Sequence, residues 1–275
     1  MTETCFHWVE EFRKDFVQRG SSQTTWNGDY WKILKKLPME SPLTATVLHD
    51  LVIGTTPNTK SRKRACMVAR QLAQFAQIDY NPKRYEGKYS PDSVNPRLVP
   101  SDTLICSEWS RLTNPGWKWV IGILATYGLR PHEAFRLDFD LLRTGDKILQ
   151  VEKNTKTGKR QVWAYHPEWF EAFNLADVQL PPIKLDRPNE AIGRSVNHYF
   201  RDAKVPFNPM LLRHRWAIRS LEYGLDYKLA ARMMGHSYIV HERIYHRWID
   251  RVILQNAYDR TLQNHQTPPL PHSED

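Results

Sequence analysis

Residues 81–102 divide the chain more sharply than any other segment. They contain four prolines among polar and charged residues, and neither a helical nor a strand-like hydrophobic period runs through them. Proline fixes its own backbone angle and lacks an amide hydrogen, so such a segment favours an extended chain. A chain of 275 residues is long enough for two modest domains. We therefore predict a first domain at residues 1–88, a linker at 89–102, a second domain at 103–265 and a disordered tail at 266–275.

The first domain has the hydrophobic pattern of four helices. Phe6, Val9, Phe12 and Phe16 recur at helical spacing, and Gly20 follows them as a stop signal. Further apolar periods follow, separated by turn signals rich in glycine, serine and proline. These patterns predict helices at residues 4–19, 26–37, 43–53 and 60–77.

The fourth of these helices is divided into an apolar and a basic side. Ala65, Val68, Ala69 and Leu72 share the apolar stripe, and basic residues occupy another face. A charged face is usually just solvated, but lysine and arginine on one helix face also suit contact with nucleic-acid phosphates. The residues that we assign to a DNA-binding surface are Lys60, Arg62, Lys63, Arg64 and Arg70.

Composition favours a polyanionic partner and argues against several other classes. The formal net charge is +9, and the three cysteines are odd in number and far apart, which suits reduced thiols. Neither metal-ligand spacing nor a glycine-rich phosphate loop is found, so we expect no metal and no cofactor. The chain opens without a secretory signal, and its longest apolar stretch is shorter than the roughly 20 residues of a membrane helix. We therefore expect a cytoplasmic protein without membrane contact.

The second domain is predicted to be mostly helical with one small β-ribbon. Residues 147–152 and 160–165 have strand character and flank a turn rich in threonine, lysine and glycine. The predicted fold class is therefore mainly α (α+β), with a helical N-terminal domain and a mostly helical second domain that holds an antiparallel ribbon. The helices expected in the second domain lie at residues 101–111, 117–127, 192–202, 210–223, 227–234 and 249–262.

Four side chains of the second domain have the chemistry of a phosphoryl-transfer site. Arg130 and Arg213 carry planar guanidiniums that can meet two phosphate oxygens at once. Tyr245 carries a hydroxyl that becomes a nucleophile when cationic neighbours and a base assist it. His236 stands nine residues before Tyr245, and it would contact a phosphate oxygen or help to deprotonate the tyrosine. Any one of these residues alone is more often structural, so the prediction depends on their order and spacing.

The order and spacing of these residues resemble the catalytic domain of the tyrosine recombinases, the phage integrase family. The shared pattern is Gly-Leu-Arg with an acidic residue three positions on, then a hairpin lysine, an Arg-His pair, a Gly-His pair and a tyrosine. Lys156 fills the lysine position, with Lys153 and Lys159 as alternatives. The resemblance covers residues 97–260 well and the first third of the chain in outline. The other matching residues are Arg130, Glu133, Arg213, His214, Gly235, His236 and Tyr245.

The resemblance implies a site-specific recombinase or integrase of a phage or another mobile element, which cuts and rejoins double-stranded DNA without metal or ATP. Tyr245 would form a 3′-phosphotyrosyl bond, and Arg130 and Arg213 would hold the phosphate. Lys156 would protonate the leaving 5′-oxygen. The resemblance also implies a homotetramer on DNA and accessory DNA-bending proteins as further partners.

One position departs from the family pattern. Three residues before the second arginine the family usually has histidine or lysine, whereas this chain has Met210, whose thioether cannot serve as a base. The departure leaves open a catalytically impaired relative that binds DNA as an accessory protein or repressor. A type IB topoisomerase-like enzyme, which shares the chemistry, is a third reading. We expect Glu133 to orient an arginine, and His214 to support the fold or an arginine.

Overall fold

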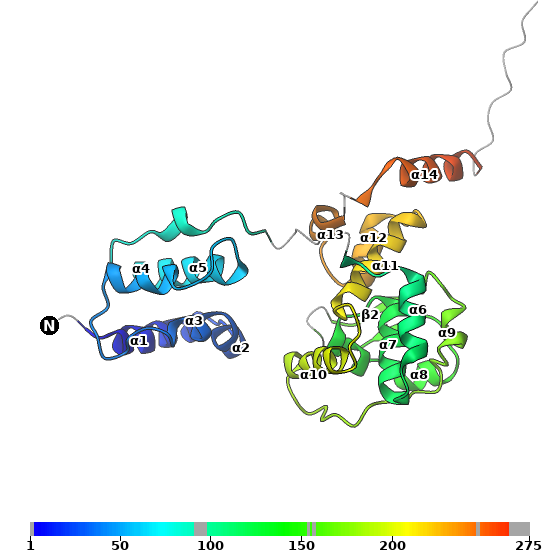
Figure 1. Ribbon diagram of the computed structural model, residues 1–275, viewed down its shortest axis with the longest axis horizontal. Helices are drawn as coiled ribbons and strands as arrows, with labels where there is room; N and C mark the ends of the chain where they lie inside the picture. The colour runs from blue at the N-terminus through cyan, green and yellow to red at the C-terminus, as the bar shows by residue number, and fades with distance from the viewer. Residues whose placement is uncertain (1–2, 91–97, 153–154, 156–157, 246–247, 264–275) are drawn as a thin grey trace, which may run out of the picture. The chain divides into compact units, whose positions relative to one another are not determined.

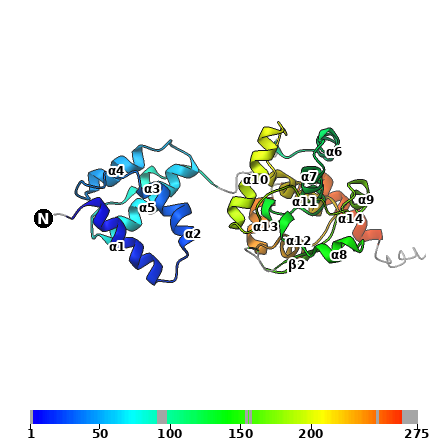
Figure 2. The same cartoon turned by 90° about the horizontal axis from the view of Figure 1, so that it is seen from below.

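The computed structural model describes residues 3–90, 98–152, 155, 158–245 and 248–263. Contacts divide the chain into two compact units, Met1–Ser93 and Val94–Asp275, which Figures 1 and 2 show in two views. Both units are mainly helical, and the described residues form one two-stranded antiparallel sheet, which confirms the predicted fold class. None of the described helices has the length and apolar character that crossing a membrane requires. Residues 91–97 of the predicted linker and the whole predicted tail lie outside the described residues.

The first unit is a set of helices whose beginnings are marked by threonine caps. Thr4, Thr44 and Thr59 each accept a hydrogen bond from the backbone amide three residues further on. Each cap satisfies an amide that the first helical turn leaves without a partner. The predicted helices are confirmed, with ends that differ by a few residues. The elements are α1 (Cys5–Gln18), α2 (Gln23–Thr25), the π-helical turn η1 (Trp26–Trp31), α3 (Lys32–Leu34), α4 (Ala45–Ile53), α5 (Lys60–Phe75) and the 3-10 turn η2 (Pro82–Tyr85).

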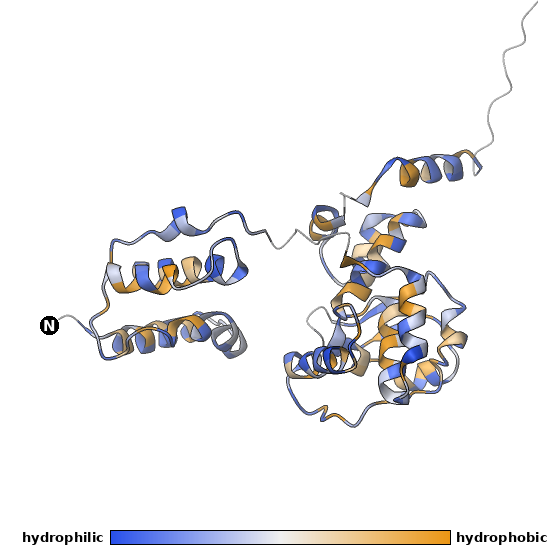
Figure 3. Ribbon diagram, viewed as in Figure 1, coloured by the Kyte–Doolittle hydropathy of each residue, from blue (hydrophilic) through white to orange (hydrophobic). Residues whose placement is uncertain are grey.

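Aromatic side chains fill the middle of the first unit. Trp26 and Tyr30 of η1 stack with their ring centroids 5.7 Å apart. Phe12 and Phe16 of α1 pack against both rings. The Tyr30 hydroxyl donates to Gln71 of α5 at 2.6 Å, which ties the aromatic cluster to the basic helix. Figure 3 shows hydrophobic and hydrophilic residues alternating along α5, as a helix with one buried side requires.

The exposed basic face of α5 is smaller than predicted because Arg62 is not part of it. Arg62 is 5% exposed, and its guanidinium donates to the Thr55 hydroxyl and to the carbonyls of Ile53 and Thr55. These acceptors lie at the C-terminal end of α4, where helix carbonyls lack partners within the helix. Arg62 therefore joins α4 to α5, which corrects its assignment to an exposed DNA-binding surface.

The second unit is built around α7, which is buried along most of its length. In the small sheet, Gln150 of β1 stands opposite Gln161 of β2. Both strands are shorter than predicted, and α13 was not predicted as a helix. The elements are α6 (Asp102–Arg111), α7 (Pro115–Tyr127), the 3-10 turn η4 (Pro131–Phe135), α8 (Phe139–Arg143), β1 (Leu149–Val151), β2 (Arg160–Val162), α9 (Trp169–Ala172), α10 (Asn189–Asp202), α11 (Met210–Glu222), α12 (Tyr227–Met234), α13 (Tyr238–Tyr245) and α14 (Arg251–Gln263).

A partly buried ion network ties the beginning of α6 to α11. The Asp102 carboxylate accepts hydrogen bonds from Arg215 and Arg219 and also contacts His166. Burial alone would raise the pKa of Asp102, but the hydrogen bonds from the two arginines outweigh it and hold that pKa well below its ordinary value. The network therefore keeps one side of α11 in place with groups that stay charged at neutral pH.

Gly128 allows α7 and α11 to approach closely. It ends α7 with φ +61°, and a Cβ added to it would lie 2.4 Å from the Cβ of Trp216 on α11. Trp216 is fully buried, so its indole has no room to retreat. Glycine is required here by the backbone angle and by the packing together.

We predict that Gly128→Ala destabilises the second unit by about 3 kcal/mol or more, because a left-handed alanine costs roughly 1–2 kcal/mol and overpacking adds roughly 1–3 kcal/mol. Gly145→Ala is the matched control, since Gly145 also has positive φ but nothing within 4 Å of an added Cβ. The control should lose about 1 kcal/mol of its free energy of unfolding. Denaturant unfolding measures both, and equal losses would contradict the packing argument.

Candidate active site

The C-terminal end of α12 gathers three arginines from three different elements. The last carbonyls of a helix have no partner within the helix and carry partial negative charge. Three successive carbonyls at this end each accept a hydrogen bond from a different guanidinium. The bonds run from Arg160 to Met233 (2.8 Å), from Arg213 to Met234 and from Arg130 to Gly235 (2.9 Å).

Glu133 lies between two of these arginines. Its carboxylate accepts from Arg130 at 2.8 Å and from Arg160 at 2.6 and 3.1 Å, and it is fully buried. It also accepts from the Arg130 backbone amide at 2.8 Å, which closes the first turn of η4. Burial acts to raise the pKa of Glu133, but the charge of Arg160 and its hydrogen bonds prevail and lower the pKa to about 2. Glu133 therefore holds both Arg130 and Arg160 in position through hydrogen bonds.

Arg213 reaches the same place from α11. It is 3% exposed, and it donates to the Gly128 carbonyl at 3.0 Å as well as to Met234. Burial and the neighbouring charge of Arg130 lower the pKa of Arg213, although a guanidinium remains protonated at neutral pH. The two arginines predicted to act together thus bind adjacent carbonyls of one helix end.

Tyr245 ends α13 and is almost fully buried. It is 2% exposed, and its hydroxyl lies 2.8 Å from Nδ1 of His214. Burial raises the pKa of Tyr245, and the charge of Arg213 acts in the opposite direction. His214 directly follows Arg213 on α11. The sequence assigned His214 to supporting the fold or an arginine, whereas the structure places it against the hydroxyl itself.

A pair of histidines lies next to Tyr245. Nε2 of His236 is 3.0 Å from Nδ1 of His241, and the His241 and Tyr245 ring centroids are 4.8 Å apart. Burial lowers the pKa of His236 to about 3 and that of His241 to about 4, with help from the positive charge of Arg213. Both imidazoles are therefore neutral at pH 7. Nε2 of His241 is buried without a hydrogen-bond partner among the described residues.

The predicted hairpin lysine cannot be placed, because Lys156 and its alternative Lys153 lie outside the described residues. The other alternative, Lys159, is exposed and immediately precedes Arg160 of β2. It lines a pocket of about 640 Å³ together with Arg160, Arg232 and Gly235. One of the three candidate lysines therefore borders the arginine cluster.

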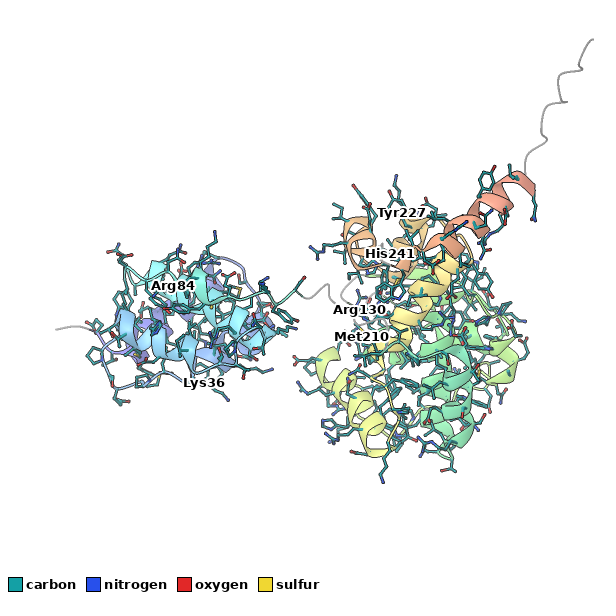
Figure 4. All side chains as sticks on the ribbon, turned by 45° about the horizontal axis from the view of Figure 1, so that its top comes forward. Lys36, Arg84, Arg130, Met210, Tyr227 and His241 are labelled. Atoms are coloured by element: carbon teal, nitrogen blue, oxygen red, sulfur yellow. The ribbon has the colours of Figure 1, made fainter. Side chains whose placement is uncertain are left out.

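Met210 stands at the beginning of α11, one turn before Arg213. Figure 4 labels it together with Arg130 and His241 on the second unit. Its side chain is 38% exposed, and its backbone amide donates to Asn208 at 2.8 Å. A thioether at this position supplies no proton acceptor.

Sequence reasoning missed Arg160 and left His241 without a role. One feature of the sequence pointed to Arg160. It is a charged residue at the first position of a strand, and the residue that shares its face of the strand, Val162, is apolar. A buried charge needs a partner, and the carboxylate of Glu133, already expected to orient an arginine, was available to it. His241 precedes Tyr245 by four residues, so the two share one face of any helix there.

We predict that Glu133→Gln costs about 3–5 kcal/mol of stability at pH 7, because it leaves buried arginines without their counter-charge. The folded pKa of Glu133, about 2, lies below its ordinary value of 4.5, so the native chain gains stability from this carboxylate above pH 4.5 and loses it as the pH falls toward 2. The variant should show a shallower loss over that window. Glu171→Gln, which removes an exposed partner of Lys147, is the control and should change stability by about 0.5 kcal/mol or less. Unfolding measured between pH 2 and pH 7 tests this, and parallel curves for native and variant protein would contradict it.

Comparison with known proteins gives relatives for both units. A family model described as the XisA/XisC excisase second domain matches residues 7–86. Excisase A of Nostoc sp. (strain PCC 7120) is 34% identical over 227 residues, which cover 70% of this chain and 48% of that protein. Excisase C of the same organism is 38% identical over 146 residues, which cover 48% of this chain and 29% of that protein. The chain thus spans about half or less of the length of these curated relatives.

Solved structures show the same fold at low sequence identity. A lambda integrase dimer bound to a COC′ core site matches with a TM-score of 0.59 and 16% identity, over 98% of this chain and 81% of that chain. The Tn1549 transposon integrase in complex with circular intermediate DNA matches with a TM-score of 0.56 and 15% identity, over 94% and 99% of the two chains. The chain therefore has a tyrosine-recombinase-like fold, and it is similar in sequence to excisases A and C.

Proposed function

We propose that this chain is a site-specific DNA recombinase that cleaves and rejoins strands through a phosphotyrosyl bond to Tyr245. The observation that carries the proposal is the placement of the Tyr245 hydroxyl. It is hydrogen bonded to His214, and the residue before His214 on α11 is Arg213, which shares the end of α12 with Arg130. A nucleophile, an imidazole and two guanidiniums therefore occur together in one unit.

In the proposed reaction, Arg130 and Arg213 bind the non-bridging oxygens of the scissile phosphate. Their positive charge stabilises the negative charge that grows on these oxygens in the transition state, and losing one such donor costs about 3 kcal/mol or more. A lysine of the hairpin, Lys156 or its alternatives Lys153 and Lys159, protonates the leaving 5′-oxygen. One phosphodiester is exchanged for another, so the bond energy is kept and no ATP is consumed.

Double-stranded DNA is the proposed partner. The solved lambda integrase structure is bound to a COC′ core site, and the Tn1549 integrase structure is a complex with circular intermediate DNA. The curated relatives are named excisases. We therefore place the chain in the cytoplasm with the DNA of a mobile element, and we favour excision as the direction. By analogy with the family, four protomers would join two duplexes, and accessory DNA-bending proteins would assist.

The first unit would contribute phosphate contacts from α5. Lys60 and Lys63 are exposed on this helix. Arg64 and Arg70 are half-buried and form ion pairs with carboxylates at 2.7 and 3.3 Å. The two lysines are therefore the strongest candidates on α5 for direct binding to phosphate, and the two arginines would have to exchange their carboxylate partners to join them.

Met210 supports a second candidate function, a DNA-binding relative with impaired chemistry. The family position for a proton acceptor holds a thioether, and Tyr245 is buried. Such a protein would bind the same DNA without cutting it, as an accessory factor or repressor.

A trapped covalent complex separates the two functions. The probe is a pool of duplexes with a randomised binding sequence and a nick, from which the short 5′-hydroxyl strand escapes after cleavage. We predict a detergent-resistant protein–DNA adduct with the native chain and none with Tyr245→Phe. Tyr238→Phe is the matched control, because Tyr238 lies on the same helix and is 48% exposed. An adduct with Tyr245→Phe, or DNA binding by the native chain without any adduct, would overturn the proposed function.

A further inference from the structure

We infer that His214 is the general base that takes the proton from Tyr245, in place of the side chain that Met210 does not provide. The inference rests on the proposed function and adds a residue that the motif pattern leaves without a chemical role. Nδ1 of His214 lies 2.8 Å from the Tyr245 hydroxyl, within the reach that proton transfer requires. Met210, one turn earlier on the same helix, is 38% exposed and has no proton acceptor.

The position of His214 on α11 allows one helix to supply two functions. Successive side chains of an α-helix point about 100° apart. Arg213 accordingly points to the end of α12, and its neighbour His214 points to α13, where Tyr245 ends the helix. The helix that holds the phosphate through an arginine would thus also hold the base against the nucleophile. A shift of α11 would move both groups together.

The other two histidines of the site are bound to each other. His236 and His241 share a hydrogen bond of 3.0 Å. His241 contacts the ring of Tyr245, with centroids 4.8 Å apart, while the Tyr245 hydroxyl is hydrogen bonded to Nδ1 of His214. The charged group that faces Tyr245 is Arg213, which is itself a donor and cannot accept a proton. His214 is therefore better placed for this step than His236, which the sequence predicted either to contact a phosphate oxygen or to help deprotonate the tyrosine.

The proposed step balances without a further reactant. The O–H bond of Tyr245 breaks, its proton passes to Nδ1 of His214, and the phenolic oxygen forms a bond to phosphorus. The bond from phosphorus to the 5′-oxygen breaks, and a protonated hairpin lysine gives that oxygen a proton. In rejoining, the 5′-hydroxyl gives its proton to the now neutral lysine and bonds to phosphorus, the bond from phosphorus to Tyr245 breaks, and the protonated imidazole returns its proton to the tyrosine. Burial, which raises the pKa of Tyr245, makes such a base necessary because the phenol does not ionise unaided at neutral pH.

The test compares His214→Gln with the native chain on two versions of the duplex recovered from the nicked pool. One version has an ordinary 5′-oxygen at the cleaved phosphate, and the other has sulfur at that bridging position, which leaves readily without a proton. We expect the rate of adduct formation to fall about 10²- to 10⁴-fold with both versions, because the defect lies on the nucleophile. His198→Gln, which changes an exposed histidine of α10, should leave the rate unchanged.

Chemical rescue provides the second arm. His214→Ala removes the ring, and free imidazole added to this variant should restore part of the rate, which it could not do for a residue that only supports packing. Thermal unfolding and retention of DNA binding check that each variant is folded. If His214→Ala does not fold, the rates of His214→Gln on the oxygen and sulfur versions of the duplex test the inference by themselves.

The outcomes separate the inference from the proposed function. If His214→Gln forms the adduct at the native rate, the inference is wrong. It is also wrong if the rate falls with the oxygen version but returns to the native value with the sulfur version, because the histidine would then act on the leaving oxygen. In both cases the Tyr245-dependent adduct of the native chain still stands. Absence of that adduct in the native chain overturns the proposed function, and the inference with it.

Discussion

Three arginines bound to one helix end are the interaction on which the second unit depends. Like charges repel, so Arg130, Arg160 and Arg213 need compensation to lie together. The end carbonyls of α12 provide part of it and the carboxylate of Glu133 provides the rest. Since each arginine comes from a different element, this one helix end positions η4, β2 and α11 relative to each other.

Helix α11 joins this cluster to the remainder of the unit. One side of it presents Arg213 and His214 to α12 and α13, and another presents Arg215 and Arg219 to Asp102 at the beginning of α6. Buried ion pairs contribute little net stability but penalise wrong arrangements strongly, since any displaced charge loses its partner. The geometry around Tyr245 is thus specified from both sides of one helix.

The fold class was predictable from sequence because it follows from hydrophobic periodicity, and the spacing of the motif residues led to the predicted site. Partnerships of long side chains were not predictable. Arg62 lies three residues before Ala65 and thus near the buried stripe of α5, and only the position of α4 decides that its guanidinium turns inward. Arg160 and His214 were underestimated for the same reason, as their partners Glu133 and Tyr245 lie 27 and 31 residues away along the chain.

Tyr245 is kept inside the protein by a short helix whose buried side chains are its own ring and that of His241. Burying a large apolar side chain is worth about 1.5–3 kcal/mol, so the docked helix is favoured by a modest margin. A binding partner shifts such an equilibrium only by its difference in affinity for the two positions of the helix. A DNA surface that binds the docked helix better than a displaced one would keep the hydroxyl against His214. A surface that favours a displaced helix would separate the two groups, so selectivity can be exercised before any bond is broken.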